Sequence, residues 1–382
     1  MSTRTALESD QQLRQIAPSH PSVLPSASTG FSEAVAVGLD LDAMIQPHMD
    51  AALAALEGTA PLLSGMARYH LGDLDAAFAP LPPEQTRAAR GKRIRPSVAL
   101  LSCAAAGGDP WVAGPVAAAI ELLHQFTLVH DDIQDESVTR RHRPTLWRIW
   151  GVGQAINAGD ALFGAAHLAL FRLRETGVSA DLTLRIAEAF DRMAVTIVEG
   201  QVLDLGFEGR PDVTPDDYLG MIARKTAAIV RFGAWAGALL AGSDEATAEG
   251  FAAFGLALGL GFQVRDDALG IWGTTAATGK AAADDIRRRK QSLPMLLLRD
   301  RADAPARTEL NSLFATDTVN EGGVRRVLEL LAAYGIQSDI EARIAALHED
   351  ARVALLAAAR PGPNPPRDLL LATVEGLAVR AG

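Results

Sequence analysis

Polar and apolar positions alternate with the period of α-helices along almost the whole chain. From Leu39 onward, segments such as LDLDAMIQPHMDAALAALEG place apolar residues three and four apart, and Gly, Pro and Asp interrupt them at helix-like intervals. Alternating runs of β-branched residues, which are typical of strands, are nearly absent. We find neither a repeat of solenoid length nor sustained heptads. The pattern predicts one all-α domain over residues 39–382, with loops at 78–91 and 359–368.

Residues 1–38 do not follow this pattern. They are rich in Ser, Pro, Thr and Gln and lack sustained periodicity, so ordering them would bury too little apolar surface to offset the entropy lost. We expect a disordered N-terminal tail. It is either passive or a docking segment for a partner, and its residues do not decide between the two.

Composition narrows the class of protein. A chain of 382 residues with 48% apolar residues can bury a large core, and its net charge of −10 argues against nucleic acid or an anionic membrane as the main partner. The single cysteine, Cys103, has apolar neighbours, so we expect a buried core residue and a cytoplasmic protein without disulfides. We expect no transmembrane segment, because the longest apolar run, 250–262, is too short to span a bilayer.

One segment, residues 130–145 (HDDIQDESVTRRHRPT), concentrates charge of both signs. The preceding IELLHQFTLV is helical in pattern, and at about 100° per residue Asp135 lies about 40° from Asp131, with Asp132 beside them. A solvated acidic surface is the ordinary alternative. However, like charges one turn apart repel each other, and a C-terminal helix end disfavours anions. We therefore expect a compensating cation, and Mg²⁺ fits because it is a hard ion that takes oxygen ligands.

The bases that follow complete this interpretation. Arg140 and Arg141, with His142 and Arg143 behind them, offer guanidinium groups whose geometry suits phosphate oxygens. Because Mg²⁺ in proteins is usually held by one or two carboxylates plus substrate phosphate, the segment predicts a metal-assisted diphosphate site.

Further polar clusters occur elsewhere in the helical pattern, and each by itself also fits an ordinary surface. They are Lys92, Arg93 and Arg95 in GKRIRP; Gln201 and Asp204 in EGQVLDL; Lys225 and Thr226 in RKTAA; Gln263, Asp266 and Asp267 in GFQVRDD; and Lys280, Asp284, Asp285 and Lys290 in GKAAADDIRRRKQSLP. A basic group before an apolar helix is a plausible anion site, and acids that end so apolar a helix would be costly to bury without a partner. Together they favour a second basic cluster and a second acidic helix end facing the first.

In these motifs, together with ELLH, AGDALF and SLP, the chain resembles the trans-isoprenyl diphosphate synthases, also termed polyprenyl synthetases, from about residue 60 to near the C-terminus. The resemblance implies the isoprenoid synthase fold, with antiparallel helices around a deep central cavity, and a homodimer. It also implies a short-chain trans-prenyltransferase that condenses isopentenyl diphosphate with dimethylallyl, geranyl or farnesyl diphosphate. The implied product is geranylgeranyl diphosphate, or next farnesyl diphosphate.

The resemblance also implies roles for individual residues, with three Mg²⁺ ions in each active site. The implied metal ligands are Asp131, Asp132, Asp135, Asp266 and Asp267. The residues implied around the allylic diphosphate are Arg140, Lys225, Thr226, Gln263, Lys280 and Lys290. Those implied for isopentenyl diphosphate are Lys92, Arg95, His124 and Arg141. Catalysis is expected to depend on Asp131, Asp132, Asp135, Arg140, Lys225, Asp266 and Lys280.

The chain departs from the family pattern at four positions. Gly270 stands where a third aspartate of the second acidic motif is usual, and Thr274 where another Asp is common. Ala283 and His142 each replace a frequent glycine. Because Asp266 is retained, we expect altered metal affinity more than lost activity.

Two other functions remain open on the sequence. A class I terpene cyclase shares the fold, but it has no use for Lys92, Arg95 and His124, and the chain lacks the usual Asn-x₃-Ser-x₃-Glu run. A non-catalytic partner subunit would fit the altered second motif and the tail. The intact first motif counts against it, because a scaffold does not need an acidic cluster at such electrostatic cost.

Product length is expected to depend on Phe126 and Thr127, which stand five and four places before Asp131. In the family, bulky residues at these places form the floor of the cavity, and a single aromatic favours the twenty-carbon product over the fifteen-carbon one. We predict that Phe126→Ala lengthens the product, which sizing of the reaction products would show. An unchanged product profile would contradict this role.

Overall fold

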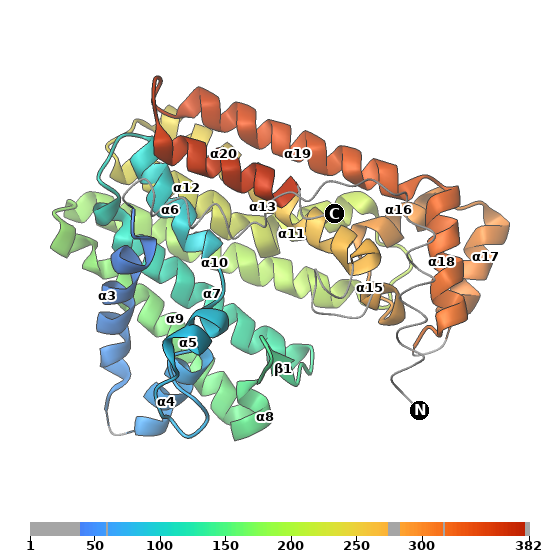
Figure 1. Ribbon diagram of the computed structural model, residues 1–382, viewed down its shortest axis with the longest axis horizontal. Coiled ribbons are helices and arrows are strands. Elements are labelled where there is room, and N and C mark those ends of the chain that lie inside the picture. The colour runs from blue at the N-terminus through green and yellow to red at the C-terminus, as the bar shows by residue number, and fades with distance from the viewer. Residues whose placement is uncertain (1–38, 59, 274–282, 316–317, 379–382) are drawn as a thin grey trace.

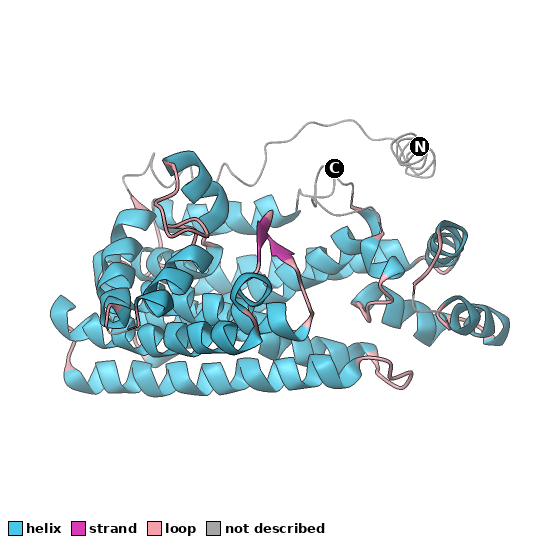
Figure 2. Ribbon diagram, turned by 90° about the horizontal axis from the view of Figure 1, so that it is seen from below, coloured by secondary structure: helices cyan, strands magenta, loops and turns pink. Residues whose placement is uncertain are grey.

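The computed structural model describes residues 39–58, 60–273, 283–315 and 318–378. The helices run side by side in stacked layers, with the longest ones along the long axis of the molecule (Figure 1). In these ranges the only strands are β1 (Thr139–Arg140) and β2 (Arg143–Pro144), which form one antiparallel hairpin (Figure 2). The prediction of an all-α fold is confirmed.

The bounds of the helices are as follows. Up to the first acidic motif they are α3 (Leu41–Leu53), η1 (Ala54–Leu56), α4 (Pro61–His70), α5 (Pro83–Arg90), α6 (Ile94–Ala105), η2 (Pro110–Ala113) and α7 (Gly114–Gln134). From the hairpin to the second motif they are α8 (Leu146–Trp150), α9 (Val152–Phe171), η3 (Arg172–Thr176), α10 (Ala180–Phe207), α11 (Pro215–Ile222), the π-helical turn η4 (Ala223–Ala227), α12 (Ala228–Leu240) and α13 (Glu245–Trp272). The last are α15 (Asp284–Arg287), α16 (Leu293–Arg301), α17 (Ala304–Leu313), α18 (Glu321–Ala333), α19 (Ile336–Ala358) and α20 (Pro365–Ala378).

The two helices that carry the acidic motifs lie within the bundle. α7 packs against α9, while α13 packs between α12 and α19, and α12 packs in turn on α6. The larger hydrophobic cluster includes α7 and the first half of α13, and a second cluster joins the end of α13 to α11, α16 and α18. The acidic ends of α7 and α13 therefore extend from rigid, buried helices.

Glycines permit the close packing of α12. A Cβ on Gly237 would lie 2.2 Å from the carbonyl oxygen of Ala99 on α6, and one on Gly255 of α13 would lie 2.6 Å from the carbonyl oxygen of Val230. Any side chain at either position would force the helix backbones apart. The glycines thus allow α6, α12 and α13 to pack closely.

The two predicted loops were wrong in part. Residues 83–90 form α5, and α20 begins at Pro365, inside the expected loop 359–368. In both cases a proline occupies the first helical turn, where its missing N–H is not needed and its fixed φ favours the helix. The prolines therefore start helices here.

Two helices are long and apolar enough to cross a membrane by length and composition, Pro110–Gln134 and Glu245–Trp272. The apolar windows of these helices are 72% and 56% buried inside the protein, and buried core helices of soluble proteins pass the same test. The expected absence of a transmembrane segment stays a prediction, and the expected tail at residues 1–38 lies outside the described residues.

Candidate active site

The three aspartates of the first acidic motif have different surroundings at the end of α7. Asp132 is 2% exposed, and the Nε of Arg140 donates to its carboxylate at 3.0 Å from each oxygen. Asp131 is half-buried and Asp135 is exposed. Asp132 thus mainly fixes Arg140, while Asp131 and Asp135 are the carboxylates best placed to meet a metal.

Among the three aspartates, Asp131 is the one whose charged form is most disfavoured by its surroundings. Its pKa is raised to about 6, chiefly by burial; the carboxylates of Asp135 and Asp204 contribute to the rise, and Lys225 and Arg140 oppose it. A carboxylate held in this way gains from a nearby cation. The cation expected from the sequence is thus consistent with the local electrostatics.

Lys225 reaches this site from the π-helical turn η4. Its ammonium lies 2.5 Å from the Oδ2 of Asp204 on α10. The two elements approach closely at Gly200, where a Cβ would lie 2.3 Å from the backbone nitrogen of Lys225. Asp204 was only a weak signal in the sequence, and Gly200, a glycine inside a helical pattern, could have revealed the close approach. Single π-helical turns are frequent at functional sites.

The hairpin β1–β2 presents the arginines that follow the first motif. Arg141 and His142 form its turn with φ values of 49° and 62°, so His142 adopts the left-handed backbone that a glycine would take more easily. Arg143 donates to the carbonyl oxygens of Tyr69 and Leu74 at 2.8 and 2.6 Å. Arg143 therefore anchors the hairpin to the end of α4 and to the segment that follows it.

The two aspartates of the second motif also differ. Asp266 is exposed at the end of α13, whereas Asp267 is fully buried. The Oδ2 of Asp267 accepts from the Tyr218 hydroxyl at 2.6 Å and from the Leu293 N–H at 3.2 Å. Gln263 donates to its Oδ1 at 3.2 Å. These contacts do not favour Asp267 as a metal ligand; it holds the end of α13 against α11 and α16.

A polar chain links this aspartate to the lysine turn. The Thr226 hydroxyl donates to Gln263 at 3.0 Å, and Gln263 in turn donates to Asp267. Sequence reasoning missed Tyr218, whose pKa is raised well above its usual value by burial and by Asp267. Three predicted residues thus form one hydrogen-bonded unit behind the exposed Asp266.

Lys290 lies beside the same unit. Burial alone would lower its pKa, but the carboxylates of Asp267, Asp285, Asp204 and Asp266 together outweigh burial and raise it. Lys290 therefore stays protonated and can meet a diphosphate oxygen. Lys280 and Thr274 lie outside the described residues.

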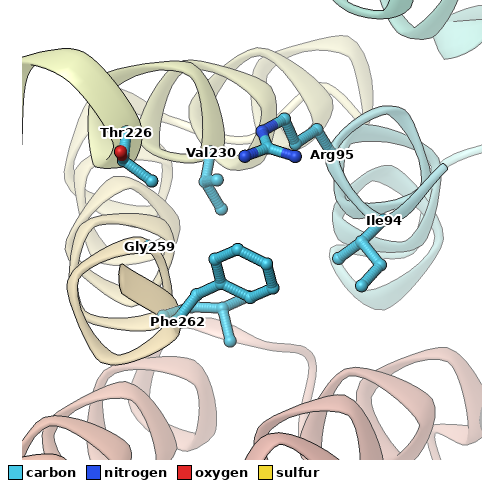
Figure 3. Close-up of a pocket in the computed structure, with 7 residues that line it drawn as sticks. Ile94, Arg95, Thr226, Val230, Gly259 and Phe262 are labelled. Carbon is cyan, nitrogen blue, oxygen red and sulfur yellow. The ribbon is translucent and has the colours of Figure 1, made fainter. Parts of the chain in front are cut away.

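Arg95 of the second basic cluster lines a small pocket between α6, η4, α12 and α13 (Figure 3). Arg95 and Ile94 extend into it from α6, Thr226 and Val230 face them, and the Phe262 ring covers one side. The guanidinium of Arg95 lies 5.6 Å from the centre of that ring. The pocket thus combines one cation with apolar walls, which suits the charged end of an apolar substrate.

His124 is tied to this arginine. A guanidinium NH of Arg95 lies 3.3 Å from the Nε2 of His124, and because arginine only donates, Nε2 is the accepting nitrogen. Burial, then Arg95 and Arg141, lower the pKa of His124 well below its usual value, so the ring is neutral. His124 therefore positions Arg95 and adds no charge of its own.

Other members of the predicted isopentenyl pocket lie nearby. Arg141 donates to the carbonyl oxygen of Ala89 at 2.6 Å, and Lys92 is exposed at the start of α6. Glu121, which the sequence reasoning did not select, is 3% exposed; burial lowers the pKa of Arg95, and the Glu121 carboxylate opposes that shift. The sequence offers one indication of Glu121: it stands three residues before His124, which is about one helical turn.

Phe126 closes the space behind the first motif. Its ring lies 5.1 Å from that of Phe163 on α9 and 4.7 Å from that of His130. Thr127 turns its hydroxyl to the carbonyl oxygen of His124 at 2.8 Å. The side chains expected to form the floor of the cavity thus include an aromatic cluster of α7 and α9, and their effect on product length stays a prediction.

The donor set fits magnesium only with help from a substrate. Among the described residues, no three His, Cys, Asp or Glu side chains are grouped closely enough to hold a metal by themselves. Asp131 and Asp135 on α7 and Asp266 on α13 offer hard oxygen ligands from two helices. This matches an ion that takes its remaining oxygens from water and from a substrate diphosphate.

A second small pocket lies beside the hairpin and is lined in part by His70. Its other polar lining residues include Gln125, Asp132, Arg140 and Arg141. Burial, followed by the neighbouring arginines, lowers the pKa of His70 to about 3, and its Nε2 has no hydrogen-bond partner among the described residues. A proton on this ring is therefore strongly disfavoured in the folded protein.

We predict that His70→Gln reduces the loss of stability on acidification. Between about pH 6.5 and pH 3 the unfolded chain binds a proton on this ring and the folded chain does not, so stability falls as the pH falls. From pH 7 to pH 5 the variant should lose about 2 kcal/mol less than the wild type in urea unfolding. The exposed His142, changed to Gln, is the control and should leave the pH response unchanged; equal losses in wild type and His70→Gln would contradict the prediction.

Comparison with known proteins agrees with this geometry. The polyprenyl synthetase family model matches residues 82–331. The geranylgeranyl diphosphate synthase of Mycobacterium tuberculosis is 40% identical over 310 residues, covering 78% of this chain and 85% of that protein. A (2E,6E)-farnesyl diphosphate synthase of Mycobacterium bovis is 41% identical over 235 residues, 62% of this chain and 63% of that protein.

Solved structures show the same architecture. The crystal structure of geranylgeranyl pyrophosphate synthetase from Pyrococcus horikoshii aligns with a TM-score of 0.77 at 30% identity, over 89% of this chain and 98% of that one. Geranylgeranyl pyrophosphate synthase from Corynebacterium glutamicum, solved with isoprenyl diphosphate and magnesium, aligns with a TM-score of 0.73 at 28% identity, over 90% and 100%. The chain belongs to the polyprenyl synthetase family, whose members are prenyl-transferring enzymes with the all-α isoprenoid synthase fold.

Proposed function

We propose that this protein is a short-chain trans-prenyltransferase that condenses isopentenyl diphosphate with allylic diphosphates. The observation that carries the proposal is the presence of two acidic helix ends together with two separate basic clusters, one at Lys225 and Arg140 and one at Arg95. Two clusters suit two diphosphate substrates. The names of the relatives support geranylgeranyl or farnesyl diphosphate as the product.

Ionisation of the allylic substrate is the first task of the site. Magnesium, when bound, neutralises the charge that grows on the departing diphosphate. Asp131, Asp135 and Asp266 would hold it, and we expect three ions in each site. Arg140, fixed by Asp132, and Lys225, fixed by Asp204, lie ready to stabilise the same developing charge without reorganisation.

The second substrate needs its own pocket. Arg95, held by His124 and the face of Phe262, would bind the isopentenyl diphosphate, with Lys92 and Arg141 adding charge. The attacking double bond would then lie along the apolar wall, where water cannot quench the allylic cation. The new carbon–carbon bond leaves a cation on the condensed product, which then loses a proton to the departed diphosphate to complete the step.

Product length follows from the floor below the first motif. Phe126 packs against Phe163, so the cavity narrows on the side of α9. With the smaller Thr127 beside it, this floor favours the twenty-carbon product over the fifteen-carbon one. The relatives named as geranylgeranyl and as farnesyl diphosphate synthases are about equally similar to this chain, at 40% and 41% identity. The length of the product is therefore a matter for experiment.

The alternative functions have weaker support. A terpene cyclase would not need the buried unit of Arg95, His124 and Glu121, which the structure builds at the cost of burying charge. A non-catalytic subunit would not need the ion pair of Lys225 and Asp204 to lie close enough to Asp131 to change its pKa. Both observations favour the synthase.

We further propose a cytoplasmic homodimer with the helical domain at residues 39–382 and a separate tail at 1–38. The supporting feature is a row of exposed apolar side chains on one face of α10: Val195, Val198, Val202 and Leu205 are 60%, 52%, 64% and 37% exposed. Soluble monomers rarely expose such contiguous apolar surface. A second copy of the chain would bury it.

The first test is to incubate the purified protein with Mg²⁺, isopentenyl diphosphate and, separately, the five-, ten- and fifteen-carbon allylic diphosphates, and to size the products. We expect linear diphosphates of twenty carbons. Hydrocarbon or alcohol formed without isopentenyl diphosphate would indicate a cyclase. Absence of turnover with every substrate would favour a partner subunit.

The dimer face is tested by Val198→Asp. A charge there would be desolvated in a dimer, so sedimentation should show the mass fall from about twice that of the chain to that of the monomer. The matched control is Val353→Asp on α19, which replaces a valine of equal exposure, 52%, and should leave the mass unchanged. A dimeric Val198→Asp variant would place the interface elsewhere.

A further inference from the structure

The β1–β2 hairpin carries Arg140 and Arg141 but cannot hold its own shape. Each strand has two residues, and an isolated two-stranded hairpin is marginal in water even when it is longer. Its turn also places two non-glycine residues, Arg141 and His142, in left-handed backbone with φ values of 49° and 62°, which costs further free energy. Contacts with the rest of the protein must therefore hold the hairpin and, with it, the two arginines.

Tyr69, the next to last residue of α4, supplies such contacts at the base of the hairpin. Tyr69 is 4% exposed, and its hydroxyl donates to the carbonyl oxygen of Pro144 at 2.8 Å. In return, Arg143 donates to the carbonyl oxygens of Tyr69 and Leu74, and its guanidinium lies 3.9 Å from the centre of the Tyr69 ring. Carbonyl oxygens and a ring face hold a guanidinium without cancelling its charge. Both residues of β2 are thus fastened to the end of α4 and the segment after it.

The same segment holds the basic loop that follows α5. Asp73 accepts from the Nη2 of Arg90, the last residue of α5, at 2.6 Å, and the two side chains are 14% and 24% exposed, so this pair is partly desolvated. Gly72, with a φ of 83°, lies against α5: a Cβ there would be 2.6 Å from the Cβ of Ala89. Arg90 directly precedes the loop 91–95, which carries the second basic cluster. The contact with Asp73 therefore fixes the start of that loop.

Arg141 joins these two held parts to each other. Its Nη1 donates to the carbonyl oxygen of Ala89 at 2.6 Å, and a Cβ on Gly91 would lie 2.8 Å from its Nη2. A side chain at position 91 would therefore displace the guanidinium. Residues 69–74, the end of α5 and the hairpin thus form a closed circuit of contacts, and Figure 1 shows α4, α5 and β1 gathered on one side of the molecule.

We propose that Tyr69 and Asp73 are positioning residues that fix the two diphosphate sites relative to each other. Tyr69 acts through Arg143 on the arginines of the hairpin, and Asp73 acts through Arg90 on the loop 91–95. The inference rests on the proposed function of the two basic clusters. A merely structural role would change the stability of the protein and leave the KM for both substrates unchanged.

The role of Tyr69 is tested by Tyr69→Phe, which keeps the ring and removes the hydroxyl that holds the hairpin. The KM for both substrates should rise about fivefold, because the hairpin carries an arginine of each cluster and a lost hydrogen bond is worth about that factor. The matched control is Tyr334→Phe at the end of α18, on the opposite side of the molecule (Figure 1), which removes a hydroxyl that accepts from the N–H of Asp303. It should leave both KM values unchanged. A Tyr69→Phe variant with unchanged KM values, even if it is less stable to heat, would overturn the role of Tyr69.

The role of Asp73 is tested by Asp73→Asn. The KM for isopentenyl diphosphate should rise about fivefold and the KM for the allylic substrate should stay within twofold, because the loop 91–95 belongs to the isopentenyl cluster alone. Arg90→Met should reproduce this effect, and the double variant should be no worse than either single one, since both changes remove the same contact.

A second ion pair of the same length, 2.6 Å, joins Glu309 of α17 to Arg326 of α18 and provides the control. Glu309→Gln should leave both KM values unchanged. Asp73→Asn with both KM values unchanged or equally raised, or a double variant whose effects add, would overturn the role of Asp73. Thermal unfolding of each variant shows how much folded enzyme contributes to each rate.

A binding readout keeps this test separate from the proposed function. Calorimetry with isopentenyl diphosphate alone, without an allylic substrate, should show about fivefold weaker binding to Asp73→Asn than to the wild type. If the wild type binds this probe but does not elongate allylic diphosphates, the proposed function fails while the role of Asp73 is still decided. Equal affinity of the wild type and Asp73→Asn would refute that role and leave the proposed function intact.

Discussion

The site depends on holding several carboxylates at two helix ends in a partly desolvated place. An unpaired buried carboxylate costs several kcal/mol, so each acid must either be paired within the protein or wait for a cation. Asp132 is paired with Arg140, and Asp204 with Lys225. Asp267 is satisfied by Tyr218, Gln263 and a backbone N–H. In the first motif, Asp131 and Asp135 are the acids that a metal would meet.

This division explains why the cations are already in place. An arginine or lysine that must be reoriented during the reaction loses rate to reorganisation, whereas one fixed by a neighbouring carboxylate does not. Gly200 makes one of these ion pairs possible, because only glycine lets α10 approach η4 closely enough to bring Asp204 to Lys225. Helix packing and charge placement are therefore set by the same contact.

Much of this could be predicted from local sequence, and the rest depends on tertiary contacts. Helical periodicity placed Asp131 and Asp135 on one face, and acids after an apolar run marked the end of α13. The environment of Asp267 could not be predicted, because its partners Tyr218 and Leu293 lie on other elements far along the chain. The role of Arg143 was hidden for the same reason: its acceptors are carbonyl oxygens near α4, which carry no sequence signal.

The two substrate regions must bring two diphosphates close together. The structure meets this requirement by limiting how many uncompensated charges lie in each region. If His124 were protonated, the isopentenyl pocket would hold three neighbouring cations with Arg95 and Arg141, and burial would make them costly. A neutral His124 that accepts from Arg95 orients the guanidinium without adding charge, and the buried Glu121 offsets part of what remains. The pocket is thus positive enough to take a diphosphate and stable enough to stay folded without one. The region around the first acidic motif solves the opposite problem, because Asp132 of the motif and Asp204 of α10 are paired with Arg140 and Lys225, and Asp131 attracts the metal.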